Sequence, residues 1–160
     1  MNQYKEIGYN KKAGYDYEII EKFEAGIILE GSEVKFLRTQ KVNGDTLHLA
    51  EAYAGFSRSN ELFLYQMNIP KYSLSNIRNH DPKRVRKLLL HRRQINRILG
   101  QLKIKGLTMI PLGLHFSSNG HVKVTLGIGK GKKSYDKRAA IKEREWNREK
   151  HRVLKNSNRF

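Results

Sequence analysis

TMIPLGLHFSSNGHVKVTLGI, residues 108–128, is the stretch of this chain that most directly predicts its fold. Its apolar and β-branched residues predict strands over Thr108–Phe116 and His121–Ile128, separated by a gap of small and polar residues. The Asn119-Gly120 pair within that gap favours a tight turn, because Asn and Gly adopt left-handed backbone conformations readily. The stretch therefore predicts an antiparallel hairpin.

Further strands are expected on the N-terminal side of this hairpin, in short apolar runs bounded by turn residues. A short helix is expected to begin at Ser32. A longer one is expected from Asp81-Pro82 to Gly106, since Asp followed by Pro is a strong helix start. The expected strands cover residues 15–23, 27–29, 47–56 and 61–69. About six short strands with inserted helices predict a mainly β fold, a closed β-barrel of the OB type.

The charge balance of the chain indicates a polyanionic partner. Its 160 residues include 32 Lys and Arg against 15 Asp and Glu, a formal net charge of +17. Such an excess repels itself in a compact protein, so nucleic acid is the first expected partner and an anionic membrane the second. No apolar stretch is long enough to span a membrane, and the N-terminus lacks a signal peptide. Together with the absence of cysteine, these features favour a cytoplasmic protein that binds nucleic acid.

The composition changes after Gly129, which divides the chain into a β-barrel domain over residues 1–129 and a basic tail over residues 130–160. The tail holds 12 Lys and Arg and 4 Asp and Glu, and therefore a net charge of +8. Its few large apolar residues cannot offset the entropy cost of ordering so long a segment. We expect the tail to be disordered when free and helical when bound; a solvated helix packed on the barrel is the alternative.

The sequence carries no catalytic or metal-binding motif. The six histidines show no metal-ligand spacing. The glycine-rich run Gly127–Lys133 lacks the Lys-Ser/Thr order of a nucleotide-binding phosphate loop. We therefore expect neither an enzyme nor a bound metal or cofactor.

Three basic segments are candidates for contact with RNA. In residues 129–138 (GKGKKSYDKR), glycines allow close approach to phosphates and Tyr135 offers a ring for stacking, although a flexible basic linker is equally consistent. Residues 80–93 place six Lys and Arg around an apolar stripe, either an RNA-facing rim or the solvated face of a helix. Residues 9–13 combine an aromatic ring, an amide and two lysines, for which a frayed leader is the plainer interpretation.

Six strings in the chain together resemble one family, the SsrA-binding proteins. They run in order along nearly the whole chain: NKKAGYDY (10–17), FEAGIILEGSEVKFLR (23–38), NHDPKRVRKLLLHRRQI (79–95), GLTMIPLGLHF (106–116), VKVTLGIGKGKKSYDKR (122–138) and IKEREW (141–146). The resemblance implies an OB-type barrel that binds the tRNA-like domain of tmRNA, the SsrA RNA, as a monomer. It also implies that the tail enters the decoding centre and the mRNA channel of a stalled ribosome. Translation then switches to the tmRNA reading frame, so that the nascent chain is tagged for degradation.

The resemblance also implies particular site residues. The implied tmRNA-binding residues are Asn10, Glu33, Leu89 and Lys123. Asn10 and Glu33 would hydrogen-bond base edges or 2′-hydroxyls, Lys123 would neutralise a phosphate, and Leu89 would pack against an unstacked base or sugar. The implied ribosome-engaging residues are Gly131, Tyr135, Asp136, Lys137, Arg138, Val153 and Leu154, and Tyr135 stands where some members carry His. Two alternatives stay open: a generic OB-fold translation factor or ribosomal protein that uses the same surface without tmRNA, and an RNA-processing enzyme.

Overall fold

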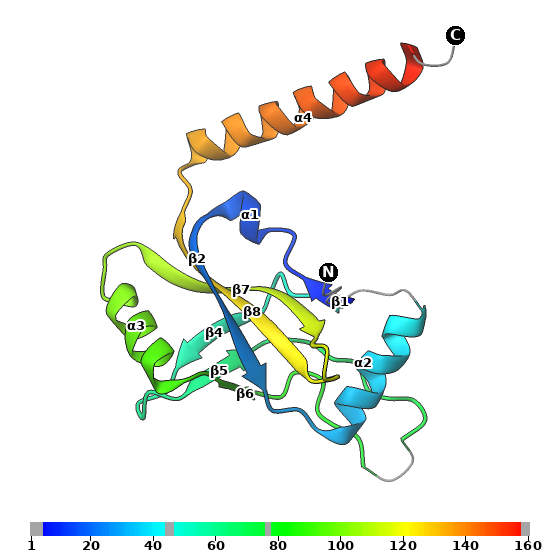
Figure 1. The fold of residues 1–160 in the computed structure, drawn as a ribbon, viewed down its shortest axis with the longest axis vertical. Coiled ribbons are helices and arrows are strands. Elements are labelled where there is room, and N and C mark those ends of the chain that lie inside the picture. Colours follow the sequence, from blue (N-terminus) through cyan, green and yellow to red (C-terminus); the bar gives the residue numbers. More distant parts are fainter. Residues whose placement is uncertain (1–4, 44–46, 76–77, 158–160) are drawn as a thin grey trace.

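The computed structural model describes residues 5–43, 47–75 and 78–157 and is dominated by one curved sheet (Figure 1). The predicted hairpin is confirmed, since β7 (Leu107–Phe116) and β8 (Val122–Gly131) pair from Leu107 opposite Lys130 to Phe116 opposite Val122. Gly120 closes the turn at a φ of 78°, the left-handed region that favours glycine. Across the described sheet the strand order is β3 (Leu47–His48), β1 (Lys5–Tyr9), β7 (Leu107–Phe116), β8 (Val122–Gly131), β2 (Tyr17–Ile27), β6 (Arg86–Leu89), β5 (Leu62–Tyr65) and β4 (Tyr53–Phe56).

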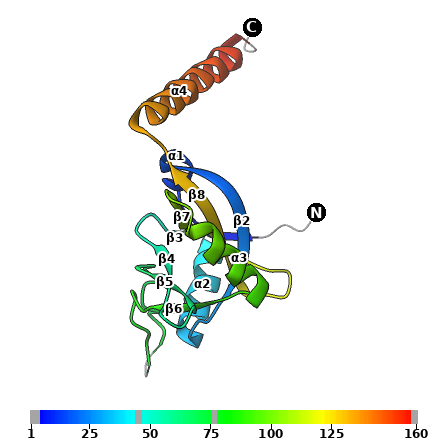
Figure 2. The ribbon, with the colours of Figure 1, turned by 90° about the vertical axis from the view of Figure 1, so that its left-hand side faces the viewer.

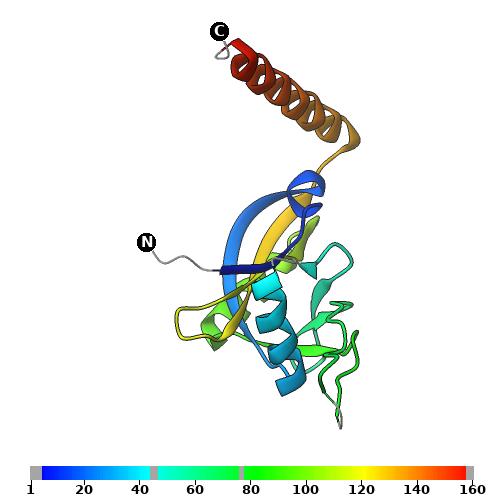
Figure 3. The same cartoon turned by 90° about the vertical axis from the view of Figure 1, so that its right-hand side faces the viewer.

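The hydrophobic core lies on the inner face of this sheet. Alternate residues of β8 point inward, and Val124, Leu126 and Ile128 are fully buried. Helix α2 (Gly31–Asn43) lies in front of the curled sheet in Figure 3, and its Leu37 joins the same core. Irregular registers in the β1–β7, β2–β8 and β7–β8 ladders mark bulges, which bend the sheet around that core.

The mainly β fold is confirmed, whereas closure of the sheet into a barrel is not. Strands β3 and β4 end the hydrogen-bonded order, and within the described ranges no ladder joins them. Strand β4 does lie near β7. Strand β8 pairs with β7 from Leu107 to Phe116 and β1 pairs with it only from Gly113 to Phe116, and no ladder between β4 and β7 is formed among the described strands. The sheet therefore curls strongly without closing.

The expectation of one long helix from Asp81-Pro82 to Gly106 is wrong over its first part. Residues 86–89 form strand β6, which pairs with β2 on one edge and β5 on the other. Arg86 and Leu88 point into the core, whereas Lys87 and Leu89 point outward. Helix α3 (Arg92–Leu102) begins only after His91, which forms a capping box with Gln94. Burial alternates from one residue to the next along 86–89, as in a strand, and pairing with β2 and β5 stabilises that conformation. The helical spacing of the leucines therefore does not produce a helix here.

The tail forms a single helix, α4 (Ser134–Ser157), that projects from the sheet (Figure 2). Strand β8 runs to Gly131, two residues past the predicted boundary at 129. Every side chain from Ile141 to Arg152 is exposed, so the middle of α4 does not pack on the sheet. Its described contacts with the rest of the chain are at its first turn, against the short helix α1 (Ala13–Asp16). Disorder of the tail in the free protein stays a prediction.

Candidate nucleic-acid interface

Leu89 and Lys123 stand on either side of a glycine on the outer face of the sheet. The β2–β6 register places Gly26 opposite Leu89, and the β2–β8 register places Gly26 opposite Lys123. Facing residues of neighbouring strands point to the same side of a sheet, so all three share one face. Because Gly26 has no side chain, a shallow hollow of about 360 Å³ opens between its neighbours. A Cβ atom at Gly26 would lie 3.3 Å from the Leu89 Cβ, so a larger residue there would crowd Leu89 and fill the hollow.

The lining of this hollow is mixed in character. Its walls are Glu24, Gly26, Leu89, Leu90, His91, Gln94 and Lys123. Leu89 is 49% exposed and gives the hollow an apolar wall. Arg92 and Arg93 are exposed in the first turn of α3, directly after the residues that line the hollow. An apolar wall beside a lysine and polar side chains suits a nucleotide, whose ring is apolar on its faces and whose phosphate is anionic.

Glu33 lies at the start of α2 and is fully buried. Its Oε2 accepts a hydrogen bond from the Glu30 backbone N–H at 2.7 Å and another from Arg84 Nη2 at 2.7 Å. Its Oε1 accepts a hydrogen bond from Arg86 Nε at 2.8 Å and pairs with Arg86 Nη2 at 2.7 Å. Both oxygens therefore have partners within the protein, so the structure does not present this carboxylate to a ligand. Reading of base edges by Glu33 stays a prediction.

Arg86 extends the same network to the loop that precedes β6. Its guanidinium is also fully buried and donates to the carbonyl oxygens of Met67 at 2.7 Å, Arg84 at 2.8 Å and Pro82 at 3.1 Å. Nearby, the buried His80 ring contacts the Ser32 hydroxyl at 2.9 Å and the Ile69 carbonyl oxygen at 2.9 Å. These contacts join the start of α2 to the loop before β6. Sequence reasoning missed the roles of Arg86 and His80, because their side-chain partners Glu33 and Ser32 lie 53 and 48 residues away along the chain.

The environment of Glu33 favours its ionised form. Burial alone would raise the pKa of this carboxyl, since it penalises the charged form. The hydrogen bonds from Arg84 and the Glu30 N–H, together with the charge of Arg86, prevail and hold the pKa below its ordinary value of 4.5. Glu33 and Arg86 are thus a buried ion pair behind the strand that carries Leu89.

Asn10 is ordered by its own side chain and does not belong to a frayed leader. Its Oδ1 accepts hydrogen bonds from the backbone N–H groups of Lys12 at 3.1 Å and Ala13 at 3.2 Å, and so caps the turn that leads into α1. Its Nδ2 donates to the Pro111 carbonyl oxygen at 3.1 Å, which ties the cap to β7. The amide is therefore used inside the protein, and base reading by Asn10 stays a prediction.

The implied ribosome-engaging residues lie along the end of β8 and along α4. Gly131 pairs with Tyr17 at the last rung of the β2–β8 ladder. Lys137 Nζ pairs with Asp16 Oδ1 at 2.8 Å, a contact that raises the pKa of Lys137. Asp136 is half-buried and Arg138 is exposed. The side chains of Tyr135, Val153 and Leu154 lie outside the part of the chain that the structure describes.

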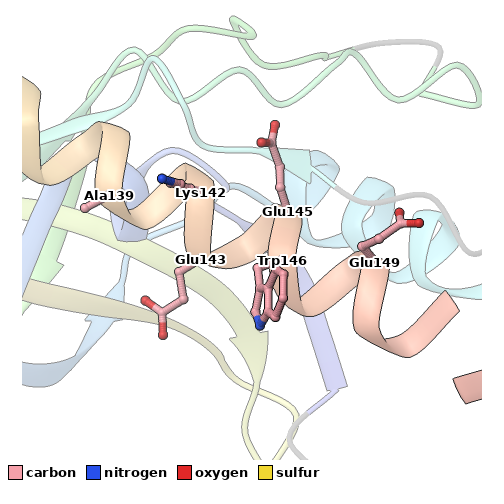
Figure 4. A pocket seen from close by; sticks show the side chains of 6 residues that line it. All are labelled: Ala139, Lys142, Glu143, Glu145, Trp146 and Glu149. Atoms are coloured by element: carbon pink, nitrogen blue, oxygen red, sulfur yellow. The ribbon is translucent and has the colours of Figure 1, made fainter. Parts of the chain in front are cut away.

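One exposed aromatic residue on α4 was not among the predicted site residues. Trp146 is 72% exposed and stands beside Glu145, with Lys142 one turn before and Glu149 one turn after (Figure 4). Sequence reasoning counted it only among the few apolar residues of the tail. The sequence does not show that Trp146 is exposed on a projecting helix; only the structure does.

The predicted residues therefore fall in two places. Leu89 and Lys123 share the hollow, and Glu33 lies behind β6 on the inner side of the same sheet. Asn10 and Lys137 both meet α1, beyond the other end of the β7–β8 hairpin. Among the helices described, none has the length and apolar character that a membrane crossing requires. The described side chains also include no cluster of three or more His, Asp or Glu residues suited to a metal ion.

Comparison with known proteins identifies the family. Residues 7–156 match the family model described as SmpB protein. An SsrA-binding protein of Wolbachia sp. subsp. Drosophila simulans is 48% identical over 151 residues, covering 94% of this chain and 97% of the relative. One from Orientia tsutsugamushi (strain Boryong) is 47% identical over 155 residues, covering 97% of each. A solved structure described as "tmRNA-SmpB: a journey to the center of the bacterial ribosome" matches with 42% identity and a TM-score of 0.63, covering 79% of this chain and 84% of that chain. The chain belongs to the SmpB protein family.

Proposed function

We propose that this protein is an RNA-binding adaptor that binds the tRNA-like domain of tmRNA and delivers it to stalled ribosomes. The observation that carries the proposal is the pairing of two separate features: the hollow between Leu89 and Lys123, and a basic helix that projects from the sheet. The relatives named SsrA-binding protein and the solved tmRNA-SmpB structure support the same partners. The consequence is trans-translation, in which the ribosome is rescued and the nascent chain is tagged for degradation.

In this proposal the hollow receives a nucleotide of the tRNA-like domain. Leu89 packs against an unstacked base or a ribose, and Lys123 neutralises the adjoining phosphate. Glu33 acts indirectly: its ion pair with Arg86 fixes the position of β6, and thereby that of Leu89. Asn10 likewise acts through the helix that it caps. Of the four predicted residues, only Leu89 and Lys123 then touch RNA.

The second part of the proposal concerns the tail. Residues 134–157 enter the decoding centre and the mRNA channel of the small subunit as a helix. The residues that engage the ribosome there are Gly131, Tyr135, Asp136, Lys137, Arg138, Val153 and Leu154. A helix rich in Lys and Arg suits a channel lined by RNA, because each neutralised phosphate releases counterions. Beyond its first turn, which is held against α1, the free tail is disordered and folds against this target.

Three further properties belong to the same proposal. The curled sheet is a variant of the OB type, with its edges left unpaired by hydrogen bonds. The protein catalyses no reaction, needs no cofactor, and works as a monomer bound to one tmRNA. Its ribosomal partner makes the cytoplasm its place of action.

A titration against three RNAs tests the proposal. The full chain is titrated with the tRNA-like domain of tmRNA, with an elongator tRNA and with a random-sequence RNA duplex, all at one salt concentration. We expect the tightest binding to the tRNA-like domain. Equal affinity for all three would overturn the proposal in favour of a generic basic RNA-binding protein, and turnover of any of the RNAs would indicate an enzyme.

A further inference from the structure

The root of the tail is held against α1 by three contacts. The Lys132 backbone N–H donates to the Asp16 carbonyl oxygen at 2.8 Å. The Lys132 ammonium donates to the Gly14 carbonyl oxygen at 2.9 Å, and Lys137 Nζ donates to Asp16 Oδ1 at 2.8 Å. Figures 1 and 2 both place α1 at the foot of α4. A helix as short as α1 is thus the part of the body that meets the projecting tail.

These contacts lie within and just beyond the short link between β8 and α4. Strand β8 ends at Gly131 and α4 begins at Ser134, so only Lys132 and Lys133 lie between them. Lys132 is fixed to α1 by its backbone and its side chain. Lys137 follows one turn into α4, where its backbone N–H bonds to the Lys133 carbonyl oxygen at 3.1 Å. The pair of Lys137 with Asp16 therefore spans this link and ties the first turn of α4 to α1.

Helix α1 is itself a fixed support. The Asn10 side chain caps it and reaches across to Pro111 of β7, and Ala13 is buried. The Lys137 ammonium also lies 5.8 Å from the centre of the Tyr15 ring, within the range of a cation–π contact. A continuous set of contacts thus runs from β7 through Asn10 and α1 to Lys137.

We propose that α1 is a bracket that aims the tail, with Asp16 as the positioning residue that sets the direction of α4 through Lys137. The inference rests on the proposed function only in that a fixed direction helps the tail enter its ribosomal channel. Asp16 and Lys137 each keep 32% of their side chains exposed. An ion pair at this exposure shifts a two-state equilibrium by about twofold to fivefold, so the bracket favours one direction and still lets the helix turn on the ribosome.

The test measures the angle of the tail directly, by a distance between two spin labels. The chain contains no cysteine, so Ser118→Cys in the hairpin turn and Ala139→Cys near the start of α4 give the only two labelling sites. Pulsed electron resonance on the full chain then gives the distribution of distances between them. We expect one main distance with Asp16 present. Asp16→Asn should lower the ratio of the population at that distance to the population at all other distances by about twofold to fivefold, and Asp16→Glu should restore it.

Two further variants make the result specific. Glu145→Gln removes the same charge from an exposed site within α4 and should leave the distribution unchanged. Lys137→Met removes the other partner of the ion pair and should broaden the distribution of distances as Asp16→Asn does. Because two different substitutions should give the same result, a folding defect in one of them does not decide the outcome. Distributions for Asp16→Asn and Lys137→Met that match the unsubstituted chain would overturn the proposal.

The outcome is separable from that of the RNA titration. Asp16 lies outside the hollow, so Asp16→Asn should bind the tRNA-like domain with unchanged affinity while tagging in a reconstituted translation system falls. Loss of RNA selectivity in the unsubstituted chain would overturn the proposed function and leave the label distances as evidence for the bracket. Selective RNA binding with unchanged label distances would overturn the bracket alone.

Discussion

Replacing Glu33 by glutamine tests whether this residue supports β6 or touches RNA. The substitution keeps the shape of the side chain and removes its charge. Glu33 and Arg86 are both fully buried, so Glu33→Gln leaves a guanidinium inside the protein without its counter-charge. Removing one partner of a buried ion pair costs about 3–5 kcal/mol of unfolding free energy. The lower end, about 3 kcal/mol, applies here because Arg86 keeps its bonds to three carbonyl oxygens.

Urea unfolding of the full chain, followed by far-ultraviolet circular dichroism, measures this loss. About 3 kcal/mol corresponds to a fall of about 10 °C in melting temperature for a domain of this size. The matched control is Glu30→Gln, because the Glu30 side chain is half-exposed and lies 3.4 Å from Arg84 Nε. An exposed pair of this kind is worth less than about 1 kcal/mol, so the control should be nearly as stable as the unsubstituted chain.

The same two variants are titrated with the tRNA-like domain. If Glu33 acts through β6, its variant should lose stability, and affinity should fall as the position of Leu89 becomes less defined. A Glu33→Gln variant as stable as Glu30→Gln, yet weakened in RNA binding, would refute the reasoning and make Glu33 a direct RNA contact.

Three other predictions concern acid stability, the lysine of the hollow and the cap of α1. Because folding lowers the Glu33 pKa below 4.5, its contribution is complete above that pH and is lost as the pH falls through the folded value. Urea titrations at decreasing pH should therefore show a steeper loss for the unsubstituted chain than for Glu33→Gln. Lys123→Ala should weaken RNA binding and reduce the slope of log affinity against log salt by about 1. The exposed Lys105, at the other end of the hairpin, should change neither quantity when replaced by alanine. Asn10→Ala removes the cap of α1, so thermal unfolding should show a loss of about 1 kcal/mol. An unchanged melting curve would mean that the cap is dispensable.

The parts of the fold that follow local rules could be predicted from the sequence. Asn119-Gly120 between two apolar runs predicts a hairpin, because turn chemistry and strand patterning involve only neighbouring residues. The helical spacing of Leu88, Ile95 and Leu102 misled the interpretation, because the state of residues 86–89 is decided by pairing with β2 and β5. Barrel closure depends on which strand edges are already occupied, and no local pattern carries that information.

The candidate site was predictable to a similar extent. Charge and the family resemblance led to Leu89 and Lys123, and their shared hollow could be recognised only from the sheet register around Gly26. The ion pair of Glu33 and the contact of Asn10 with β7 were not predictable, because the partners are 53 residues away at Arg86 and 101 residues away at Pro111. Such partners meet only when the whole sheet has formed.

Localised cleavage of bound RNA tests most directly whether the hollow is the RNA-binding face. An iron chelate is attached to a single cysteine introduced at Glu24, on the rim of the hollow, or at the exposed Ile104, beyond the end of α3. Radicals released from the iron cut only nearby nucleotides of the tRNA-like domain. We predict a short cluster of cuts from position 24 and none from position 104. Cuts from position 104 with none from position 24 would contradict the account.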